Sequence, residues 1–98
     1  MELRQLEYFM ITCEKGSFNQ AAECLYTTQP NVSKVISSLE KELGRKLVER
    51  SSRGLRITPY GETVRDYAKV ILKHASLISS MATHHNGKKF TLATYPSN

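Results

Sequence analysis

The sequence has no apolar run that could cross a membrane and no export signal at its start. A membrane-spanning helix needs roughly 18 consecutive apolar residues, and no stretch of the chain approaches that length. Glu2, Arg4 and Glu7 place charges among the first residues, which is not the pattern of a signal peptide. We therefore expect a cytoplasmic protein with no membrane partner.

Cysteines and clustered catalytic side chains are also scarce. Cys13 and Cys24 are too few for a disulfide scaffold and lack the close pairing of a metal site, so we expect both to be buried as small apolar residues. His84 and His85 are adjacent and would point about 100° apart on a helix, and His74 is distant, so we expect no bound metal. No Ser/His/Asp set, paired carboxylates or glycine-rich phosphate loop is found. The sequence therefore predicts a protein that is not an enzyme.

Acidic residues are outnumbered, and most strongly in the middle of the chain. Fourteen Lys and Arg oppose nine Asp and Glu over 98 residues, for a net charge of +5. Residues 34–56 hold seven basic and three acidic residues, whereas residues 1–33 hold two basic and four acidic ones. A basic segment inside a small domain favours a nucleic-acid partner, and a merely solvated basic surface is the alternative.

Apolar residues recur at helical spacing in three segments before residue 44. The first segment ends at Gly16, and a short second helix follows Ser17. Either Thr27 or Thr28 can cap a third helix over residues 29–43, in which Pro30 suits the first turn and Gly44 marks the end. The third helix has one apolar face, made by Val32, Val35, Ile36, Leu39 and Leu43.

After Gly44 the pattern changes to two short strands and then a long helix. Strands over residues 46–49 and 55–58 are predicted, joined by a basic hairpin tip over residues 51–54. Thr58 and Pro59 then begin a helix of about 26 residues, which ends near Asn86 and Gly87. Its apolar residues follow a heptad spacing that predicts a dimerisation seam: Val64, Ala68, Ile71, Ala75, Ile78 and Ala82.

Three helices followed by a hairpin predict a mainly α fold, the winged helix-turn-helix. We expect this domain over residues 1–58, a linker and dimerisation helix over residues 59–87, and the start of a truncated second domain over residues 88–98. In that last segment residues 90–95 read as a strand. Four tyrosines are expected to be half-buried packing residues: Tyr8, Tyr26, Tyr60 and Tyr67.

The outward face of the third helix indicates how nucleic acid would be contacted. At about 100° per residue, the face opposite Val32 carries Pro30, Lys34, Ser37 and Lys41, with Gln29, Asn31, Ser33 and Ser38 on its flanks. Amide, hydroxyl and ammonium groups of this kind can hydrogen-bond base edges and phosphates in a major groove. A solvated face without contacts is the alternative.

The spacing of these residues resembles that of the LysR-type transcriptional regulators over residues 1–85. The matching positions are Ser17, Phe18, Ala21, Ala22, Leu25, Gln29, Pro30, Ser33, Ile36, Leu39, Glu40, Glu42, Leu43, Gly44, Leu47, Arg50, Arg53, Thr58 and Gly61. Asn31 and Lys34 depart from the family, in which Ala and Arg are common at those positions.

The resemblance implies a bacterial transcription factor that binds double-stranded DNA. Gln29, Pro30, Ser33 and Lys34 would then lie in the major groove and Arg53 near the minor groove, with Thr28 and Arg50 on phosphates. It also implies an antiparallel homodimer through the long helix and a tetramer at full length. No cofactor is expected in this part of the chain, but the full-length protein would bind a small-molecule co-inducer and have RNA polymerase as a candidate partner.

Two alternatives remain open from the sequence. Winged helices also serve as protein-docking modules without DNA binding, although the Glu-free front of the third helix argues against that reading. A different winged-helix regulator family would also bind DNA, but it would not explain a terminal heptad helix followed at once by a strand.

Overall fold

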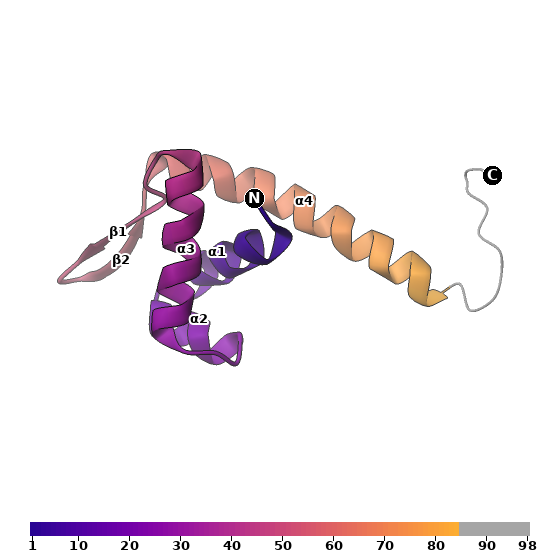
Figure 1. Ribbon diagram of the computed structural model, residues 1–98, viewed down its shortest axis with the longest axis horizontal. Coiled ribbons are helices and arrows are strands. Elements are labelled where there is room, and N and C mark those ends of the chain that lie inside the picture. Colours follow the sequence, from indigo (N-terminus) through magenta and orange to yellow (C-terminus); the bar gives the residue numbers. More distant parts are fainter. Residues whose placement is uncertain (85–98) are drawn as a thin grey trace.

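The computed structural model describes residues 1–84, which form four helices and a two-stranded sheet. The elements are α1 (Leu3–Lys15), α2 (Phe18–Cys24), α3 (Gln29–Leu43), β1 (Val48–Ser51), β2 (Gly54–Ile57) and α4 (Pro59–His84). The first three helices pack together, the β1–β2 hairpin projects to one side, and α4 extends away on the other (Figure 1). This architecture confirms the predicted winged helix-turn-helix, and we call the hairpin the wing.

The helix boundaries follow local chemistry. Of the two candidate caps for α3, Thr28 is the one used: its Oγ1 accepts the backbone N–H of Asn31 at 3.3 Å. Gly16 and Gly44 end α1 and α3 in the left-handed conformation, with φ of 67° and 76°. The predicted range of 29–43 for the third helix is therefore confirmed.

The core lies where the three short helices meet the beginning of α4. Phe9, Val32, Ile36, Leu39 and Leu47 are each less than 2% exposed. Predicted face residue Val35 is also buried, whereas Leu43 is only half-buried at the core's edge. Burial of these side chains supplies most of the favourable free energy of a domain this small.

The wing strands begin two residues later than predicted at β1 and one residue earlier at β2. Val48 pairs with Ile57 and Ser51 with Gly54 in antiparallel register. Leu47 does not join the ladder because its carbonyl accepts the Thr58 N–H at 3.0 Å and its own N–H donates to Glu40. The tip is closed by the Ser51 hydroxyl, which donates to the Gly54 carbonyl and accepts the Arg53 N–H.

The start of α4 is pressed directly against the chain that leads into the wing. Thr58 caps the helix as predicted, because its Oγ1 accepts the Gly61 N–H at 2.9 Å. A Cβ atom built on Gly61 would lie 2.2 Å from the Leu47 carbonyl oxygen. Only glycine therefore permits this approach between helix and wing.

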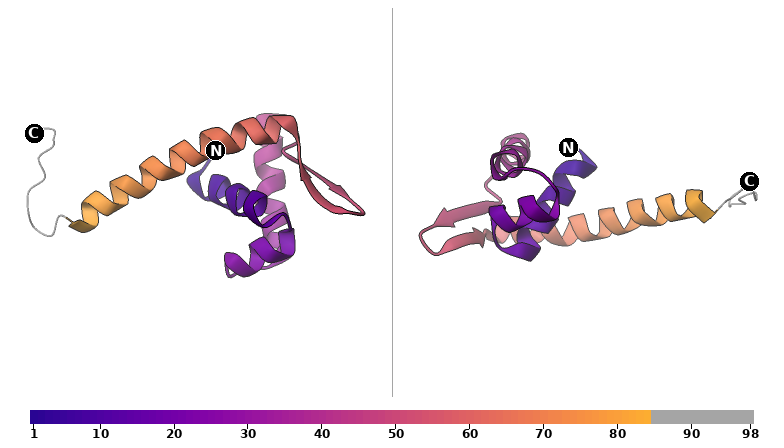
Figure 2. Two further views of the ribbon diagram at one scale, coloured as in Figure 1. Left: turned by 180° about the vertical axis from the view of Figure 1, so that it is seen from behind. Right: turned by 90° about the horizontal axis from the view of Figure 1, so that it is seen from below.

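The predicted seam along α4 is wrong in its first part. Ala68 is 1% exposed and Val64 is half-buried, because both pack on the core through α1, together with Leu72. These residues have an intramolecular partner that the heptad spacing could not reveal. Figure 2 shows the first half of α4 alongside the helical cluster and the second half extending beyond it.

The apolar surface that α4 leaves exposed is rotated from the predicted seam. Its large side chains are Tyr67, Val70, Ile71, Leu77, Ile78 and Met81, which we call the α4 stripe. At 3.6 residues per turn they share one face, whose centre lies about 80° from Val64 and about 120° from Ala68. Ile71 and Ile78 belong to both sets, whereas Ala75 is half-buried and Ala82 is a small exposed side chain beside the stripe.

Two of the four tyrosines are not the half-buried residues that were predicted. Tyr8 and Tyr60 are half-buried, but Tyr67 lies on the α4 stripe and Tyr26 is 97% exposed. Tyr26 occupies the left-handed position after α2, with φ of 55°. The Thr27 N–H donates to Ala22 and the Tyr26 N–H to Glu23, which is the usual hydrogen-bond pattern of a helix end.

Some predictions concern residues outside the described part of the chain. The helix end near Asn86 and Gly87, the strand over residues 90–95 and the domain assigned to residues 88–98 all lie there, as does His85. Within residues 1–84, no helix is long and apolar enough to cross a membrane.

The two cysteines differ in their surroundings, which corrects the expectation that both are buried. Cys24 is exposed, whereas Cys13 is half-buried on the apolar side of α1. Burial raises the pKa of the Cys13 thiol to about 11. Because the thiolate is the reactive form, Cys13 is unreactive at neutral pH.

We therefore predict that one thiol per chain reacts rapidly with an aromatic disulfide reagent at pH 8, and that the second reacts only on unfolding. Cys24→Ser should abolish the rapid phase and Cys13→Ser should preserve it. Two equally rapid thiols in the folded protein would contradict this assignment.

Candidate nucleic-acid interface

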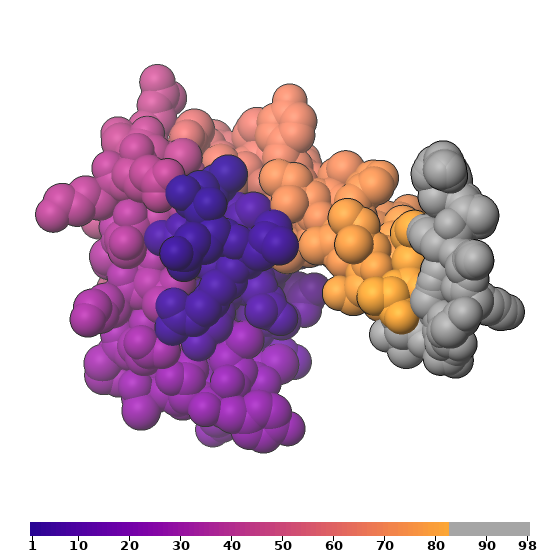
Figure 3. All heavy atoms as spheres, turned by 45° about the vertical axis from the view of Figure 1, so that its right-hand side comes forward, coloured from indigo at the N-terminus to yellow at the C-terminus, as the bar shows by residue number. Residues whose placement is uncertain are grey.

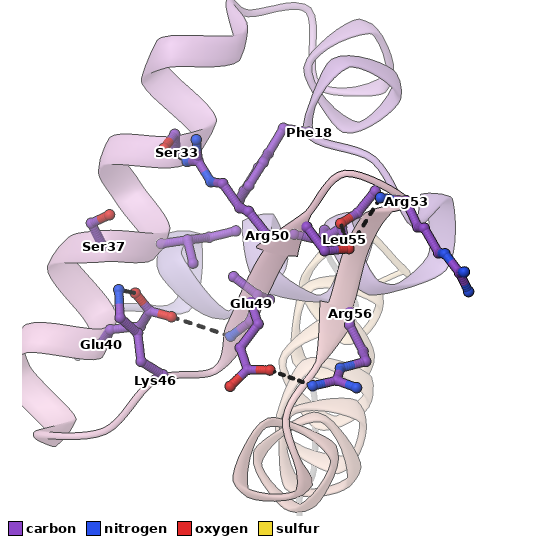
Figure 4. A pocket seen from close by; sticks show the side chains of 14 residues that line it. Phe18, Ser33, Ser37, Glu40, Lys46, Glu49, Arg50, Arg53, Leu55 and Arg56 are labelled. Carbon is purple, nitrogen blue, oxygen red and sulfur yellow. Dashed lines mark hydrogen bonds and ion pairs between the residues drawn. The ribbon is translucent and has the colours of Figure 1, made fainter.

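A groove of about 1000 Å³ runs between α3 and the wing. Figure 4 shows its side chains converging from α2, α3 and both strands. We call it the α3–wing groove. The side chains that line it are those of Phe18, Ser33, Ile36, Ser37, Glu40, Lys46, Val48, Glu49, Arg50, Ser51, Arg53, Leu55 and Arg56.

A buried carboxylate joins the two walls of this groove. Glu40 Oε2 accepts the backbone N–H groups of Leu47 at 2.8 Å and Val48 at 3.2 Å. Glu40 Oε1 also lies 3.7 Å from the Lys46 ammonium. The side chain is only 9% exposed. Glu40 thus satisfies two backbone donors at the first residues of the wing and fixes where the wing leaves α3.

Arg50 crosses the groove near its other end. Its guanidinium carbon lies 4.5 Å from the centre of the Phe18 ring, a cation–π distance. Its Nη2 also donates a hydrogen bond to Ser33 Oγ on α3. Arg50 remains exposed, so the guanidinium keeps further N–H donors for an external partner.

The other two arginines of the wing differ in their partners. Arg56 Nη2 donates to Glu49 Oε1 at 2.7 Å across the strand pair, and that hydrogen bond raises the pKa of Arg56. Arg53 stands at the turn of the wing, with its guanidinium directed away from α3 (Figure 4). Within residues 1–84 the Arg53 side chain forms no ion pair.

The predicted contact residues of α3 do not all share one environment. Pro30 and Lys34 are exposed, as are Ser37 and Lys41 further along the same face. Gln29 is half-buried, which corrects the expectation that it is exposed, and it borders a smaller hollow beside Arg50 and Ser51. Thr28 is exposed at the helix start, with its side chain engaged as the cap.

Asn31 and Ser38 lie on the flank of α3 that faces away from the wing. Asn31 is half-buried and its Nδ2 donates to Thr27 Oγ1 at 2.9 Å. Ser38 Oγ accepts from Gln5 Nε2 on α1 at 3.5 Å. Both border a shallow hollow that they share with Lys34. The predicted set is therefore divided between a wing side and an α1 side, with Lys34 exposed between them.

Two residues that shape the site were not among the predicted contact residues. Glu40 and Phe18 were named only as positions that match the LysR-type pattern. A signal existed for Glu40, since it lies about 80° from Val32 on α3 and thus beside the apolar face. No sequence signal pairs Phe18 with Arg50, because that contact depends on the placement of the wing.

Within residues 1–84, no three His, Cys, Asp or Glu side chains are close enough together to hold a metal ion. The α3–wing groove is lined by cationic and hydroxyl side chains from α3, the wing and the segment between them.

Residues 3–62 match the family described as "Bacterial regulatory helix-turn-helix protein, lysR family". This chain belongs to the LysR family. It is 43% identical over 81 residues to the HTH-type transcriptional regulator BenM of Acinetobacter baylyi. The matched region covers 83% of this chain and 27% of BenM.

Two solved structures of LysR-family domains resemble the fold closely. One is a complex of the BenM DNA-binding domain with catB site 1 DNA, with a TM-score of 0.85 and 39% identity, covering 92% of this chain and all of that one. The other is a complex of the CbnR DNA-binding domain with DNA, with a TM-score of 0.79 and 36% identity, covering 86% and 97%. The chain spans only 27–32% of the length of curated LysR relatives such as BenM.

Because Glu40 accepts two buried backbone N–H groups, its removal should destabilise this LysR domain. Glu40→Ala leaves the Leu47 and Val48 N–H groups without their acceptor, and each such buried donor costs about 1–3 kcal/mol. We therefore expect a lower melting temperature, by about 4–8 °C for each kcal/mol lost.

Glu42→Ala is the matched control, because Glu42 is exposed two residues further along the same helix and its ion pair with the N-terminal ammonium, at 2.6 Å, is a surface one. Thermal unfolding followed by circular dichroism measures both variants. Equal melting temperatures for Glu40→Ala and the wild type would show that the carboxylate does not anchor the wing.

Proposed function

We propose that this LysR domain binds double-stranded DNA with sequence preference and serves as the DNA-binding part of a bacterial transcription regulator. In this proposal α3 enters the major groove and the wing lies along the adjacent backbone or minor groove. The observation that carries it is the exposed face of α3, where Pro30, Lys34, Ser37 and Lys41 include no carboxylate and stand beside a basic wing. Its likeness to two domains solved with DNA supports the same reading.

The electrostatics of the α3–wing groove support a polyanion as the ligand. Of the three acidic residues in the basic segment, Glu40 is buried and Glu49 is paired with Arg56. Glu42 is exposed but lies at the far end of α3. The cations near the start of α3 and on the wing, by contrast, are open to solvent, so phosphates meet a predominantly positive surface.

The residues fall into two proposed roles. Gln29, Ser33 and Lys34 stand on the first turns of α3, where a groove-inserted helix meets base edges, and Lys can donate to guanine O6 or N7. Arg53 and Arg50 on the wing, with Thr28 at the helix start, suit phosphates or a narrow minor groove. Asn31 and Ser38 would contact the backbone on the α1 side.

A homodimer through α4 belongs to the same proposal. The α4 stripe leaves apolar side chains exposed along one face, including Ile78 at 67% and Leu77 at 50%. A contiguous exposed apolar surface of this kind marks a protein contact. We assign the contact to the α4 stripe of a second copy rather than to Val64 and Ala68, which the core already covers.

The rest of the proposal concerns the full-length protein. Because the LysR relatives are much longer than this chain, we propose a further domain that binds a small-molecule co-inducer and controls transcription. Assembly into tetramers and contact with RNA polymerase complete the proposed activity.

Lys34→Ala and Arg53→Ala should separate base reading from backbone binding. A lost base contact costs about 1–3 kcal/mol on the preferred sequence and much less on random DNA. A lost phosphate contact weakens binding to both kinds of DNA. It also reduces the slope of log affinity against log salt concentration by about one. Fluorescence anisotropy with duplexes selected from a random library, and with unselected duplexes, measures this at several salt concentrations.

We expect Lys34→Ala to narrow the affinity gap between the two kinds of DNA. We expect Arg53→Ala to weaken binding to both kinds of DNA. If the Arg53 side chain enters an A·T-rich minor groove, Arg53→Ala also narrows the affinity gap, but less than Lys34→Ala does. Equal proportional losses for the two variants on both DNAs would remove α3 as the reading helix. A domain that ignores duplex DNA and heparin at moderate salt would instead be a protein-docking module.

Ile78→Asp should shift the dimer to monomer, because it places a charge in the centre of the proposed contact. Sedimentation equilibrium compares it with the wild type and with Ser76→Asp, which introduces the same charge on the opposite, polar face of α4. Leu77→Asp tests the rotated stripe separately from the heptad seam. Unchanged association of Ile78→Asp and Leu77→Asp would exclude the α4 stripe as the interface.

A further inference from the structure

Arg50 is held between two other elements at the edge of the α3–wing groove. Figure 4 shows its side chain reaching from β1 past Phe18 to Ser33. The guanidinium lies 4.5 Å from the Phe18 ring centre, and Nη2 donates to Ser33 Oγ. Stacking on the ring restricts the plane of the guanidinium, so the N–H that meets Ser33 has a defined direction.

This bond restricts where the Ser33 hydroxyl hydrogen can point. A serine hydroxyl has one O–H donor and two acceptor lone pairs, whereas Arg has donors only. Ser33 must therefore accept from Arg50, and its hydrogen has to point elsewhere. Serine in a helix often donates to the carbonyl of the preceding turn, but Ser33 forms no such bond within the described residues. Its hydrogen remains available to an external acceptor.

We propose that Ser33 reads DNA through its hydroxyl hydrogen and that Arg50, seated on Phe18, is the positioning residue that directs this hydrogen toward the DNA. The inference rests on the proposed function, in which α3 lies in the major groove. Guanine presents N7 and O6 there, adenine N7 and thymine O4, whereas cytosine presents an amino donor. At the base that Ser33 faces, an acceptor is therefore preferred to the cytosine amino group.

The positioning role differs from phosphate binding in its charge requirement. Arg50 keeps further N–H groups beyond the one given to Ser33, so it can also contact a phosphate. Arg50→Lys retains the positive charge but loses the planar group that stacks and donates in a fixed direction. It therefore removes positioning while leaving most of the charge attraction.

The test uses the 98-residue chain and duplexes selected from a random library. Affinities are measured for the wild type, Ser33→Ala, Arg50→Lys and the double variant. The pair that Ser33 faces is the one at which Ser33→Ala loses base preference. A purine there is then replaced by its 7-deaza analogue, or a thymine by the analogue that lacks O4.

We expect Ser33→Ala to weaken the selected duplex about three- to tenfold, the size of one neutral hydrogen bond, with no change on random duplexes. Removal of the acceptor atom from the base should weaken binding of the wild type by the same factor. It should not change the affinity of Ser33→Ala. Arg50→Lys should lose the same base preference with an unchanged salt slope, and adding Ser33→Ala to it should cost little more. Phe18→Leu should lose the same base preference as Arg50→Lys, provided that its melting temperature equals that of the wild type. If Phe18→Leu is less stable, Arg50→Lys alone tests the positioning role.

Lys34→Ala is the matched control, since Lys34 lies on the same helix and is not in contact with Arg50. The factor by which Lys34→Ala weakens binding should multiply with the factor for Arg50→Lys when the two substitutions are combined. If the losses of Ser33→Ala and Arg50→Lys also multiply, Arg50 does not position Ser33 and the inference is wrong. Equal weakening of random and selected duplexes by Ser33→Ala would make Ser33 a phosphate contact and would also overturn it. Failure of the proposed function has another signature: no duplex binds the wild type, or Lys34→Ala has no effect.

Discussion

The attachment of the wing to α3 through the Glu40 carboxylate is the constraint on which the rest of the domain depends. A charge that is almost fully buried is costly unless it is well paired. Glu40 meets this requirement by accepting two backbone N–H groups and by lying near the Lys46 ammonium. The same bonds determine the residue at which the chain leaves α3 and enters the hairpin. The distance between α3 and the wing is thus set by contacts inside the domain.

Leu47 is the point at which this constraint reaches α4. Its N–H is bound to Glu40, its side chain is fully buried, and its carbonyl accepts the Thr58 N–H. Gly61 then allows the first turn of α4 to lie against that same carbonyl. Three elements therefore meet at one residue, and a displacement of the wing would also displace the axis of α4. The α3–wing groove and the exposed end of α4 are thus connected through Leu47 without any direct contact between them.

Features governed by neighbouring residues could be predicted from the sequence, whereas those governed by tertiary contacts could not. The limits of α3 and the start of α4 follow from Thr28, Pro30, Gly44 and Thr58, whose caps act within four residues. The start of β1 was misplaced because Leu47 is taken out of the ladder by Glu40 and Thr58. The heptad spacing correctly indicated an amphipathic helix, but it could not distinguish Ala68, which packs on α1, from Ile78, which is exposed. Likewise, the residue types around the groove were predicted, but the seating of Arg50 on Phe18 was not.

The division of α4 into two halves explains why its exposed face is rotated from the heptad seam. In the first half, α1 takes the side carrying Val64, Ala68 and Leu72, so these residues cannot serve another interface. Tyr67, Val70 and Ile71 lie to one side of that contact and continue into Leu77, Ile78 and Met81 beyond the core. A partner helix that follows this continuous stripe passes beside the helical cluster rather than through it. None of the residues that line the α3–wing groove belongs to α4, so the α4 stripe and the groove share no side chain.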